Sequence, residues 1–446
     1  MTLLYKNVIQ LSRYPVKSLK RKVNMQRGRF GHRPRNDSRY YNGDYPFIQT
    51  GNVVKASESN EKIQYSQTLN ELGLTTSRLF EERVLVITIA ANIGYTAILD
   101  YPACFPDSLV ALSARDSEVS IDYLNIYLRL IRRYVENLAP QAAQKNINLK
   151  QLGSLPVIVP GREIQQTIVR KMNDAYDNKI NMLKKAQRIQ NSIEKYLLGE
   201  LGIELIREDG RSLESRIFST EWKSIVGSRF DPYYHNPFFS RNINNILRGK
   251  YQTAPLETVA GGTVKGMVPD ESGKDGNSKD ENGKVIQINS INPDGTVDVN
   301  RYASTRKVYP RRLKLNKGDV LVVITGATIG KIGFWDYEGD YYLGGDMVKF
   351  NTGNEALNEI YASLLRTEPY QLLIKRCITG ATNGHLAPRD IERLPLPCIP
   401  EEKIQTRIAV RLSALREEVR SLKTAAEDVV ETAKDEAGRI LLGGRV

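Results

Sequence analysis

An internal duplication constrains the fold of this chain more than any other feature. The segment VLVITIAANIG at residues 84–94 returns as VLVVITGATIG at residues 320–330, a shift of 236 residues. Both copies open with an apolar, β-branched run that is typical of a buried strand. Both then carry a small residue, a polar residue, Ile and Gly in the same order. The repeated segment is therefore a strand followed by a turn.

Two further landmarks repeat in the same order. Ile48–Gln49 in YPFIQTGNV matches Ile286–Gln287 in KVIQINSIN, a shift of 238 residues. LPVIVPGREIQQTI matches LPLPCIPEEKIQTRI, with a shift of 240 residues from Pro160 and Pro400 onward. The period is far too long for a solenoid of short repeats. We infer that a whole domain and the helix that follows it were duplicated.

A long helix is predicted after each of these prolines. Apolar residues there recur in steps of four and three, which is the a/d pattern of a coiled coil. The predicted seam residues are Ile168, Met172, Met182 and Ile189 in the first helix and Ile408, Leu412, Leu415, Val419, Leu422 and Val429 in the second, with Lys179 as the charged break. About 40 residues would span roughly 60 Å at 1.5 Å per residue. Two separate amphipathic helices, each on its own domain, are the alternative. The shared starting point of the narrow seams favours one antiparallel coiled coil, which would relate the halves by a pseudo-twofold axis.

The regions around the helices predict a mixed α/β (α+β) fold with two similar globular domains. Short helices are expected at residues 123–138 and 359–374, and a Gly/Asp/Lys/Asn-rich exposed loop at 269–284. The predicted order is a first recognition domain at 1–158, a central helix at 159–201, a linker at 202–228, a second recognition domain at 229–399 and a C-terminal helix at 400–446.

The charge of the chain favours a polyanionic partner. The net charge is +13 and the pI is about 9.4. Between residues 17 and 39 nine basic residues face a single acid, Asp37, and Tyr40, Tyr41 and Tyr45 follow. Lys and Arg neutralise phosphates, and Tyr can bond to phosphate or stack on bases. A solubilising basic surface is the alternative interpretation.

Cysteine usage and hydropathy indicate the compartment. Cys104, Cys377 and Cys398 lie far apart, which fits neither a disulfide framework nor a zinc site. No apolar run approaches the roughly 18 residues that span a bilayer, and the N-terminus lacks the apolar core of a signal peptide. We expect a cytoplasmic protein without a membrane partner.

Several segments resemble catalytic motifs only in part. Asp231–Pro232–Tyr233–Tyr234 is similar to the motif of adenine methyltransferases, but Tyr233 stands where that motif has a second proline. GATIGK at residues 326–331 has three residues between its glycines where a phosphate loop has four, and Ile332 replaces the Ser or Thr that would hold magnesium. The histidines His32, His235 and His385 are scattered. The sequence therefore predicts no catalytic residue and no metal site.

Taken together, the chain resembles the specificity subunits of type I restriction–modification enzymes. The resemblance rests on LPVIVPGREIQQTIV and LPLPCIPEEKIQTRIA, on AANIG and GATIG, on GDYPFIQTGNV, and on SRFDPYY at residues 228–234. One departure is Gly161–Arg162–Glu163, where the family usually starts its helix with acidic residues. The resemblance covers essentially the whole chain in the order of the family.

The resemblance implies that each domain reads one half of a split double-stranded DNA site and that the helices fix the gap. It implies docking of methyltransferase subunits, in two copies, and of a restriction and translocase subunit. S-adenosylmethionine, ATP and Mg²⁺ would then be bound by these partners, and this chain would hold no cofactor. The alternatives are the specificity subunit of another DNA modification or defence system, a single-chain DNA-modifying enzyme, and a coiled-coil scaffold without DNA.

Base edges in the major groove are read mainly by Arg, Lys, Asn and Gln. On this basis the DNA-binding candidates of the first domain are Arg27, Arg29, Arg33, Arg35, Gln49, Thr50, Asn92 and Tyr95. Those of the second domain are Lys265, Gln287, Asn289, Ser290, Thr328, Lys331 and Asn383. An ordinary polar loop residue is the alternative for each of them.

Overall fold

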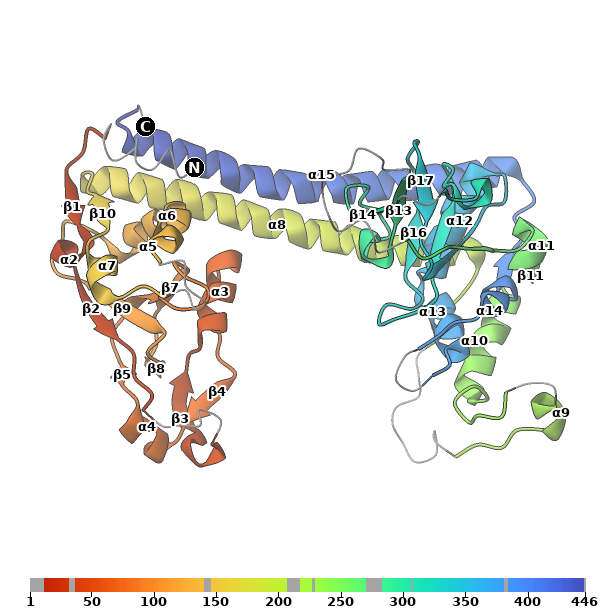
Figure 1. Ribbon diagram of the computed structural model, residues 1–446, viewed down its shortest axis with the longest axis horizontal. Helices are drawn as coiled ribbons and strands as arrows, with labels where there is room; N and C mark the ends of the chain where they lie inside the picture. The colour runs from red at the N-terminus through yellow and green to blue at the C-terminus, as the bar shows by residue number, and fades with distance from the viewer. Residues whose placement is uncertain are drawn as a thin grey trace. The chain divides into compact units, whose positions relative to one another are not determined.

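The computed structural model describes residues 12–31, 37–139, 146–206, 217–226, 229–269, 283–305, 308–380 and 384–444. The chain forms two compact units, each with its own sheets and core (Figure 1). Unit 1 comprises residues 1–185 and 421–446, and unit 2 comprises residues 186–420. The division cuts through both long helices, so each unit contains one recognition domain and a segment of each helix.

Unit 1 is built on an antiparallel sheet with the strand order β2-β9-β6-β7. Its strands are β2 (Val23–Arg27), β6 (Val84–Thr88), β7 (Thr96–Leu99) and β9 (Leu109–Ala114). All five residues of β6 are buried, since this strand has a neighbour on both edges. Its β-branched side chains suit such a pleated, enclosed position.

A second sheet and a short ladder complete the strands of unit 1. The sheet has the order β4-β3-β8-β5, in which β3 and β8 run parallel. The bounds are β1 (Val16–Ser18), β3 (Tyr41–Phe47), β4 (Gln67–Leu69), β5 (Leu79–Phe80), β8 (Ala103–Cys104) and β10 (Pro156–Ile158). The ladder β1–β10 joins the start of the domain to the strand that leads into the long helix.

The helices of unit 1 cover these sheets. They are α2 (Leu19–Lys22), α3 (Thr50–Ser59), α4 (Glu71–Thr76), α5 (Ile121–Leu130), α6 (Arg132–Asn137) and α7 (Leu149–Gly153), with the 3₁₀ turn η1 (Ser38–Tyr40). α5 begins at the N-cap Ser120, whose side chain accepts a hydrogen bond from the Tyr123 N–H. Its Tyr123, Leu124 and Leu128 side chains are fully buried and form part of the main core.

Unit 2 repeats this arrangement of strands. The antiparallel sheet has the order β12-β18-β15-β16, and a second sheet has the order β14-β13-β17, with β13 and β17 parallel. The bounds are β11 (Thr253–Pro255), β12 (Val264–Lys265), β13 (Gly283–Ile286), β14 (Tyr302–Thr305), β15 (Val320–Val323), β16 (Ile332–Phe334), β17 (Tyr341–Leu343), β18 (Met347–Phe350) and β19 (Pro395–Pro397). The ladder β11–β19 has the register of β1–β10. The predicted duplication of a whole domain is therefore confirmed.

The helices of unit 2 follow the same order, with additions. They are α9 (Trp222–Ile225), α10 (Pro237–Leu247), α11 (Leu256–Ala260), α12 (Glu355–Leu365), α13 (Glu368–Cys377) and α14 (Pro388–Glu392), with the 3₁₀ turns η4 (Ile288–Ser290) and η5 (Arg311–Leu313). The helix predicted at residues 359–374 is two helices, α12 and α13. Pro369 in the first turn of α13 explains the break, because proline suits a helix start and disrupts a helix interior.

Tyrosine hydroxyls fasten the short helices to the strand before each long helix. In unit 1 the hydroxyls of Tyr123 and Tyr127 donate to the carbonyls of Ile158 and Pro156, at 2.8 and 2.9 Å. In unit 2 Tyr361 and Tyr370 donate to the carbonyls of Pro397 and Pro395, at 2.9 and 2.6 Å. The same two positions of the strand are used, although Tyr127 lies on α5 and Tyr370 on the later helix α13. The duplication thus preserved the contact while its source moved along the chain.

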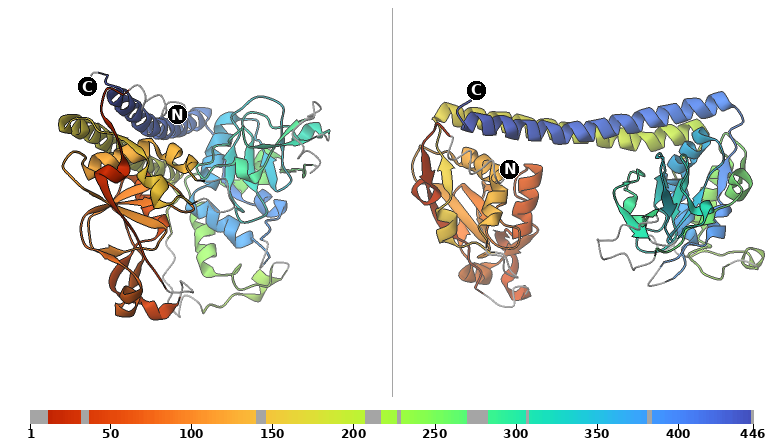
Figure 2. Two further views of the ribbon diagram at one scale, coloured as in Figure 1. Left: turned by 60° about the vertical axis from the view of Figure 1, so that its left-hand side comes forward. Right: turned by 45° about the horizontal axis from the view of Figure 1, so that its top comes forward.

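The two long helices are α8 (Arg162–Leu201) and α15 (Glu402–Leu441), each of 40 residues. They lie side by side in both views of Figure 2 and in Figure 1. In unit 1 Lys171 of α8 pairs with Glu436 of α15 at 3.1 Å. In unit 2 Glu200 of α8 pairs with Arg407 of α15 at 2.6 Å. Early residues of one helix meet late residues of the other in each unit, so the predicted antiparallel pairing is confirmed.

The predicted seam is partly buried. Ile168, Met172, Ile408, Leu412, Leu415 and Val419 are at most 6 % exposed. Met182, Ile189 and Leu422 are half-buried. Near the end of α15 Val430 is the buried valine and Val429 is half-buried. A straight helix turns every 3.6 residues and drifts against a seven-residue repeat, so an extra step of four restores the buried face.

Within the residues that the structure describes, no helix is long and apolar enough to cross a membrane.

Candidate nucleic-acid interface

The repeated strand–turn segments are hairpin turns with two left-handed positions each. The turn after β6 has positive φ at Ala91 (60°) and Gly94 (82°), and the turn after β15 has it at Gly326 (84°) and Gly330 (83°). Ala91 therefore lies opposite Gly326, and the turn of unit 2 holds one more residue between its left-handed positions. The sequence alignment had placed Ala91 on Ala327, one residue further along.

Each turn is held at its base and exposed at its tip. Gly94 N–H donates to the Thr88 carbonyl and Gly330 N–H to the Val323 carbonyl, both at 2.9 Å. An isolated bridge connects Ala90 with Asn146 in unit 1 and Thr325 with His385 in unit 2. The candidates Asn92 and Thr328 are exposed on these turns. Both are thus free to meet a ligand from a fixed backbone.

The paired glutamines Gln49 and Gln287 end equivalent strands. The backbone N–H of Gln49 donates to the Asn52 side chain at 2.8 Å, and that of Gln287 donates to the Ser290 hydroxyl at 3.1 Å. Each glutamine therefore precedes a helical turn that is closed by a side chain three residues later. The Gln49 side chain also bonds to Gln67 on β4, while that of Gln287 is half-buried.

Ser290 is a correction to the predicted interface. It is fully buried, because its hydroxyl accepts from the Gln287 N–H and donates to the Arg301 carbonyl. A hydroxyl with both partners inside the protein stabilises the η4 turn and cannot reach a base edge. Asn289, its neighbour, is exposed. The alternation between a buried and an exposed residue is set by the 3₁₀ turn, which the sequence did not indicate.

The other described candidates lie at or near the surface. Arg27 and Arg29 are exposed at the end of β2, and Lys265 is exposed on β12. The Thr50 hydroxyl lies 3.1 Å from that of Ser108, and the Tyr95 ring stacks under the Arg132 guanidinium at 4.5 Å. Lys331 is half-buried.

Arg33, Arg35 and Asn383 lie outside the described residues, as does most of the loop at 269–284.

The segments with catalytic resemblance have structural roles. The Asp231 carboxylate pairs with Arg229 at 2.8 Å and accepts from the Tyr234 N–H at 2.8 Å. The Arg229 guanidinium also donates to the Cys377 carbonyl at the end of α13. GATIGK leads into strand β16, whereas a phosphate loop leads into a helix. The described part of the chain holds no cluster of His, Cys, Asp or Glu that could bind a metal ion.

Comparison with known proteins decides the family. The model of the type I restriction modification DNA specificity domain matches twice, over residues 28–195 and 272–432, which is more than half of the chain. The chain belongs to this family. A solved chain described under complex assembly and conformational transition of the type I R-M system aligns with a TM-score of 0.56 and 12 % identity over 96 % of both chains. The S subunit from M. genitalium aligns with a TM-score of 0.48 and 11 % identity, again over 96 % of both chains.

This specificity subunit carries an aromatic and basic surface that the sequence analysis missed. The Lys284 ammonium lies 5.0 Å from the ring centroid of Tyr302 and 5.4 Å from that of Tyr341. The three residues come from neighbouring strands, since β13 pairs with both β14 and β17. Lys284 is exposed and Tyr302 is 39 % exposed. Only strand pairing brings them together, so no local sequence pattern could have found the set.

Each recognition domain of the specificity subunit is tied to a long helix through one buried arginine. In unit 1 Arg129 of α5 donates to Asn60 at 2.6 Å and lies 5.7 Å from the Tyr176 ring of α8. In unit 2 Arg416 of α15, at the position equivalent to Tyr176, donates to Glu359 of α12 at 3.2 Å. The guanidinium has thus moved from the domain to the helix. Burial raises the pKa of Glu359, while the charge of Arg416 opposes that rise.

Proposed function

We propose that this chain reads a bipartite double-stranded DNA site, with one half-site for each recognition domain. The observation that carries the proposal is that both units place an exposed hairpin turn, with two left-handed positions, on the same sheet. The family match and the net charge of +13 support DNA as the ligand. The antiparallel helices would then serve as the spacer that sets the gap.

We further propose that the chain is non-catalytic and works with partner subunits. Methyltransferase subunits, in two copies, would supply S-adenosylmethionine, and a restriction and translocase subunit would supply the ATP- and Mg²⁺-dependent steps. The structural roles of Asp231 and of the GATIGK turn support this assignment, because neither segment has the geometry of the motif that it resembles. The complex would act in the cytoplasm.

A domain exchange tests the proposal. Residues 1–158 are replaced by the matching domain of a relative with a different target, and methylated sites are mapped by sequencing in cells that also produce the methyltransferase subunit. One half-site is expected to change, while the other half-site and the gap stay the same. A change in both half-sites would show that the domains do not read DNA independently. Methylation of DNA by the purified chain alone would show that it is an enzyme.

A further inference from the structure

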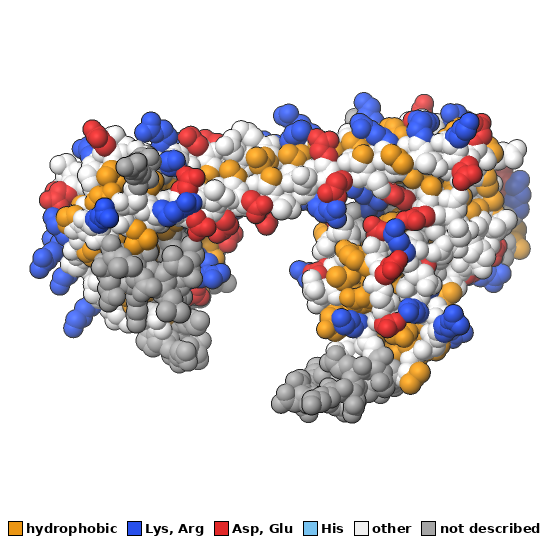
Figure 3. Space-filling view, turned by 90° about the horizontal axis from the view of Figure 1, so that it is seen from above, with side chains coloured by type: hydrophobic (Ala, Val, Ile, Leu, Met, Phe, Trp, Pro, Cys, Tyr) orange, Lys and Arg blue, Asp and Glu red, His pale blue; other side chains and the backbone are white. Residues whose placement is uncertain are grey.

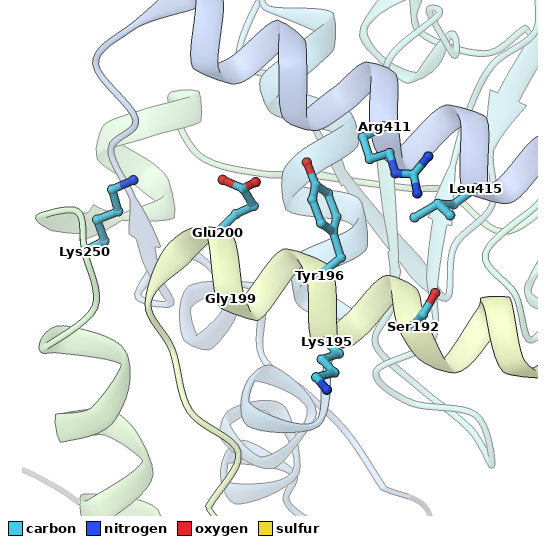
Figure 4. Close-up of a pocket in the computed structure, with 8 residues that line it drawn as sticks. All are labelled: Ser192, Lys195, Tyr196, Gly199, Glu200, Lys250, Arg411 and Leu415. Atoms are coloured by element: carbon cyan, nitrogen blue, oxygen red, sulfur yellow. The ribbon is translucent and has the colours of Figure 1, made fainter.

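Unit 2 contains an open groove of about 620 Å³ at the C-terminal end of α8. Figure 4 shows Tyr196 and Glu200 of α8 pointing toward α15, from which Arg411 and Leu415 project, with Lys250 at one end. Lys195 points away from α15 in this view. Glu200 is engaged by Arg407, whose two terminal nitrogens bond to its two oxygens at 2.6 and 2.7 Å. Within the described residues Arg411 has no such ion pair.

The equivalent position in unit 1 shows what Arg411 lacks. The shift of 240 residues between the helices places Lys171 opposite Arg411 and Glu436 opposite Tyr196. Lys171 and Glu436 form an ion pair at 3.1 Å, so unit 1 supplies its own carboxylate. In unit 2 a tyrosine stands where that carboxylate would be. The cation is retained and its acidic partner is missing.

The remaining residues of the groove add to this difference in charge. Lys250 contacts Gly202 at the end of α8 as Arg13 contacts Gly443 at the end of α15, so one cation is present at each end. Asp435 of unit 1 has Lys195 as its counterpart in unit 2. Unit 1 therefore combines Lys171 and Arg13 with Asp435 and Glu436, which balance. Unit 2 combines three cations with Glu200, which Arg407 already neutralises.

Apolar surface accompanies the unpaired cation. Val410, next to Arg411 on α15, is 62 % exposed, and Leu415 lines the groove. Figure 3 looks onto the face that carries the long helices, where apolar side chains lie between charged ones. Such a combination fits a protein segment that carries both an acidic and an apolar side chain. A second copy of this chain fits poorly because each copy carries a net charge of +13.

We propose that this groove receives an acidic, partly apolar segment of the methyltransferase subunit, whose carboxylate pairs with Arg411. The inference rests on the proposed function, which supplies the partner. It makes the two docking ends unequal, since the end in unit 2 is open and basic and its counterpart in unit 1 is closed by Glu436. The first methyltransferase subunit to bind therefore occupies the end in unit 2.

Calorimetric titration of the full chain with the methyltransferase subunit tests the inference. The wild type is expected to bind a first copy more tightly than a second. Arg411→Glu reverses the charge, and Tyr196→Glu gives the groove the carboxylate that unit 1 already has. Each is expected to weaken the tighter step about ten-fold or more. The matched control Lys171→Glu leaves that step unchanged, and thermal unfolding of each variant shows that the fold is retained.

The possible results separate the two proposals. If the wild type binds the methyltransferase subunit and both groove variants bind it equally well, the groove is not the docking site, while the proposed function stands. If the wild type binds no methyltransferase subunit, the proposed function fails and the inference fails with it. If Arg411→Glu weakens binding of the chain to DNA and leaves the methyltransferase affinity intact, the groove contacts nucleic acid and the inference is overturned.

Discussion

The side-chain oxygen of Gln165 on α8 accepts a hydrogen bond from the backbone N–H of Ser120, the N-cap of α5, at 3.0 Å. Its side-chain nitrogen donates to the carbonyls of Glu118 and Pro160. Gln405 on α15 repeats the arrangement, since it bonds to Asn354, the N-cap of α12, and to the Ile399 carbonyl. The glutamine that follows isoleucine in both helices thus locks a recognition domain to the helix behind it.

Replacing Gln165 with Leu is expected to lower the free energy of unfolding of unit 1 by about 1–3 kcal/mol. Gln165 is 1 % exposed, and its loss leaves backbone groups buried without hydrogen bonds. Denaturant titration followed by circular dichroism measures the change. Gln166→Leu is the matched control, because the neighbouring side chain is exposed. Equal effects of the two substitutions would contradict the locking role.

Ala91 is predicted to be a site where glycine stabilises the protein. Its φ of 60° costs an L-residue roughly 1–2 kcal/mol, and the equivalent residue of unit 2 is Gly326. Ala91→Gly is therefore expected to raise the melting temperature, and Gly326→Ala to lower it. The space around Gly326 is open, with the nearest atom 3.9 Å from an added Cβ, so backbone strain alone is tested. Opposite signs in differential scanning calorimetry are the expected outcome.

The ion pair of Arg416 and Glu359 gives a pH-dependent prediction. Their side chains are 20 % and 12 % exposed. Arg416→Ala leaves Glu359 buried without its cation and is expected to cost about 3–5 kcal/mol at neutral pH. Burial raises the pKa of Glu359, so the folded state binds a proton more tightly than the unfolded state does. The stability deficit of the variant therefore shrinks as the pH falls toward the raised pKa and grows as the pH rises through it.

Unfolding curves between pH 4 and pH 8 measure this effect, an interval chosen around the ordinary pKa of a glutamate, about 4.3. The double variant Arg416→Met/Glu359→Gln is the control, since it removes both charges and is expected to lose most of the pH dependence. A deficit of the single variant that stays constant with pH would show that Glu359 is not the responsible group.

The sequence predicted the features that repeat and missed those that depend on pairing across the chain. The duplication, the mixed α/β class and the two helices follow from patterns within single segments. By contrast, the register of the turn depends on backbone angles, which is why Ala91 aligns with Gly326 and not with Ala327. The burial of Ser290 and the meeting of Lys284 with Tyr302 likewise depend on contacts between segments. Residue type alone cannot separate such a polar side chain from one that faces a ligand.

The seam of the long helices is open to a direct test. Leu412 is fully buried, whereas Leu422 is half-buried. Leu412→Asp places a carboxylate without a partner in the core and is expected to cost several kcal/mol, while Leu422→Asp is expected to cost clearly less. Ala414→Asp, at an exposed position of the same helix, is the control and is expected to leave stability nearly unchanged. An order other than this would show that the buried face of α15 is assigned wrongly.

Lys284 and Asn289 are predicted to contribute to DNA binding in different ways. Lys284 lies on a strand between two tyrosines and suits the DNA backbone, so Lys284→Ala is expected to weaken binding to every sequence and to reduce the slope of log K against log salt by about 1. Asn289 is exposed after the same strand and suits a base edge. Asn289→Ala is therefore expected to relax the sequence preference in the half-site of the second domain alone.

Fluorescence anisotropy with the assembled methyltransferase complex measures both effects, on DNA with cognate half-sites and on DNA with one half-site altered. Lys317→Ala is the control for the lysine, since Lys317 is engaged by Glu355 at 3.1 Å within the same domain. If Lys284→Ala leaves the salt slope as steep as Lys317→Ala does, the aromatic and basic surface does not meet phosphate. If Asn289→Ala alters the preference in the half-site of the first domain, the two domains do not read their half-sites separately.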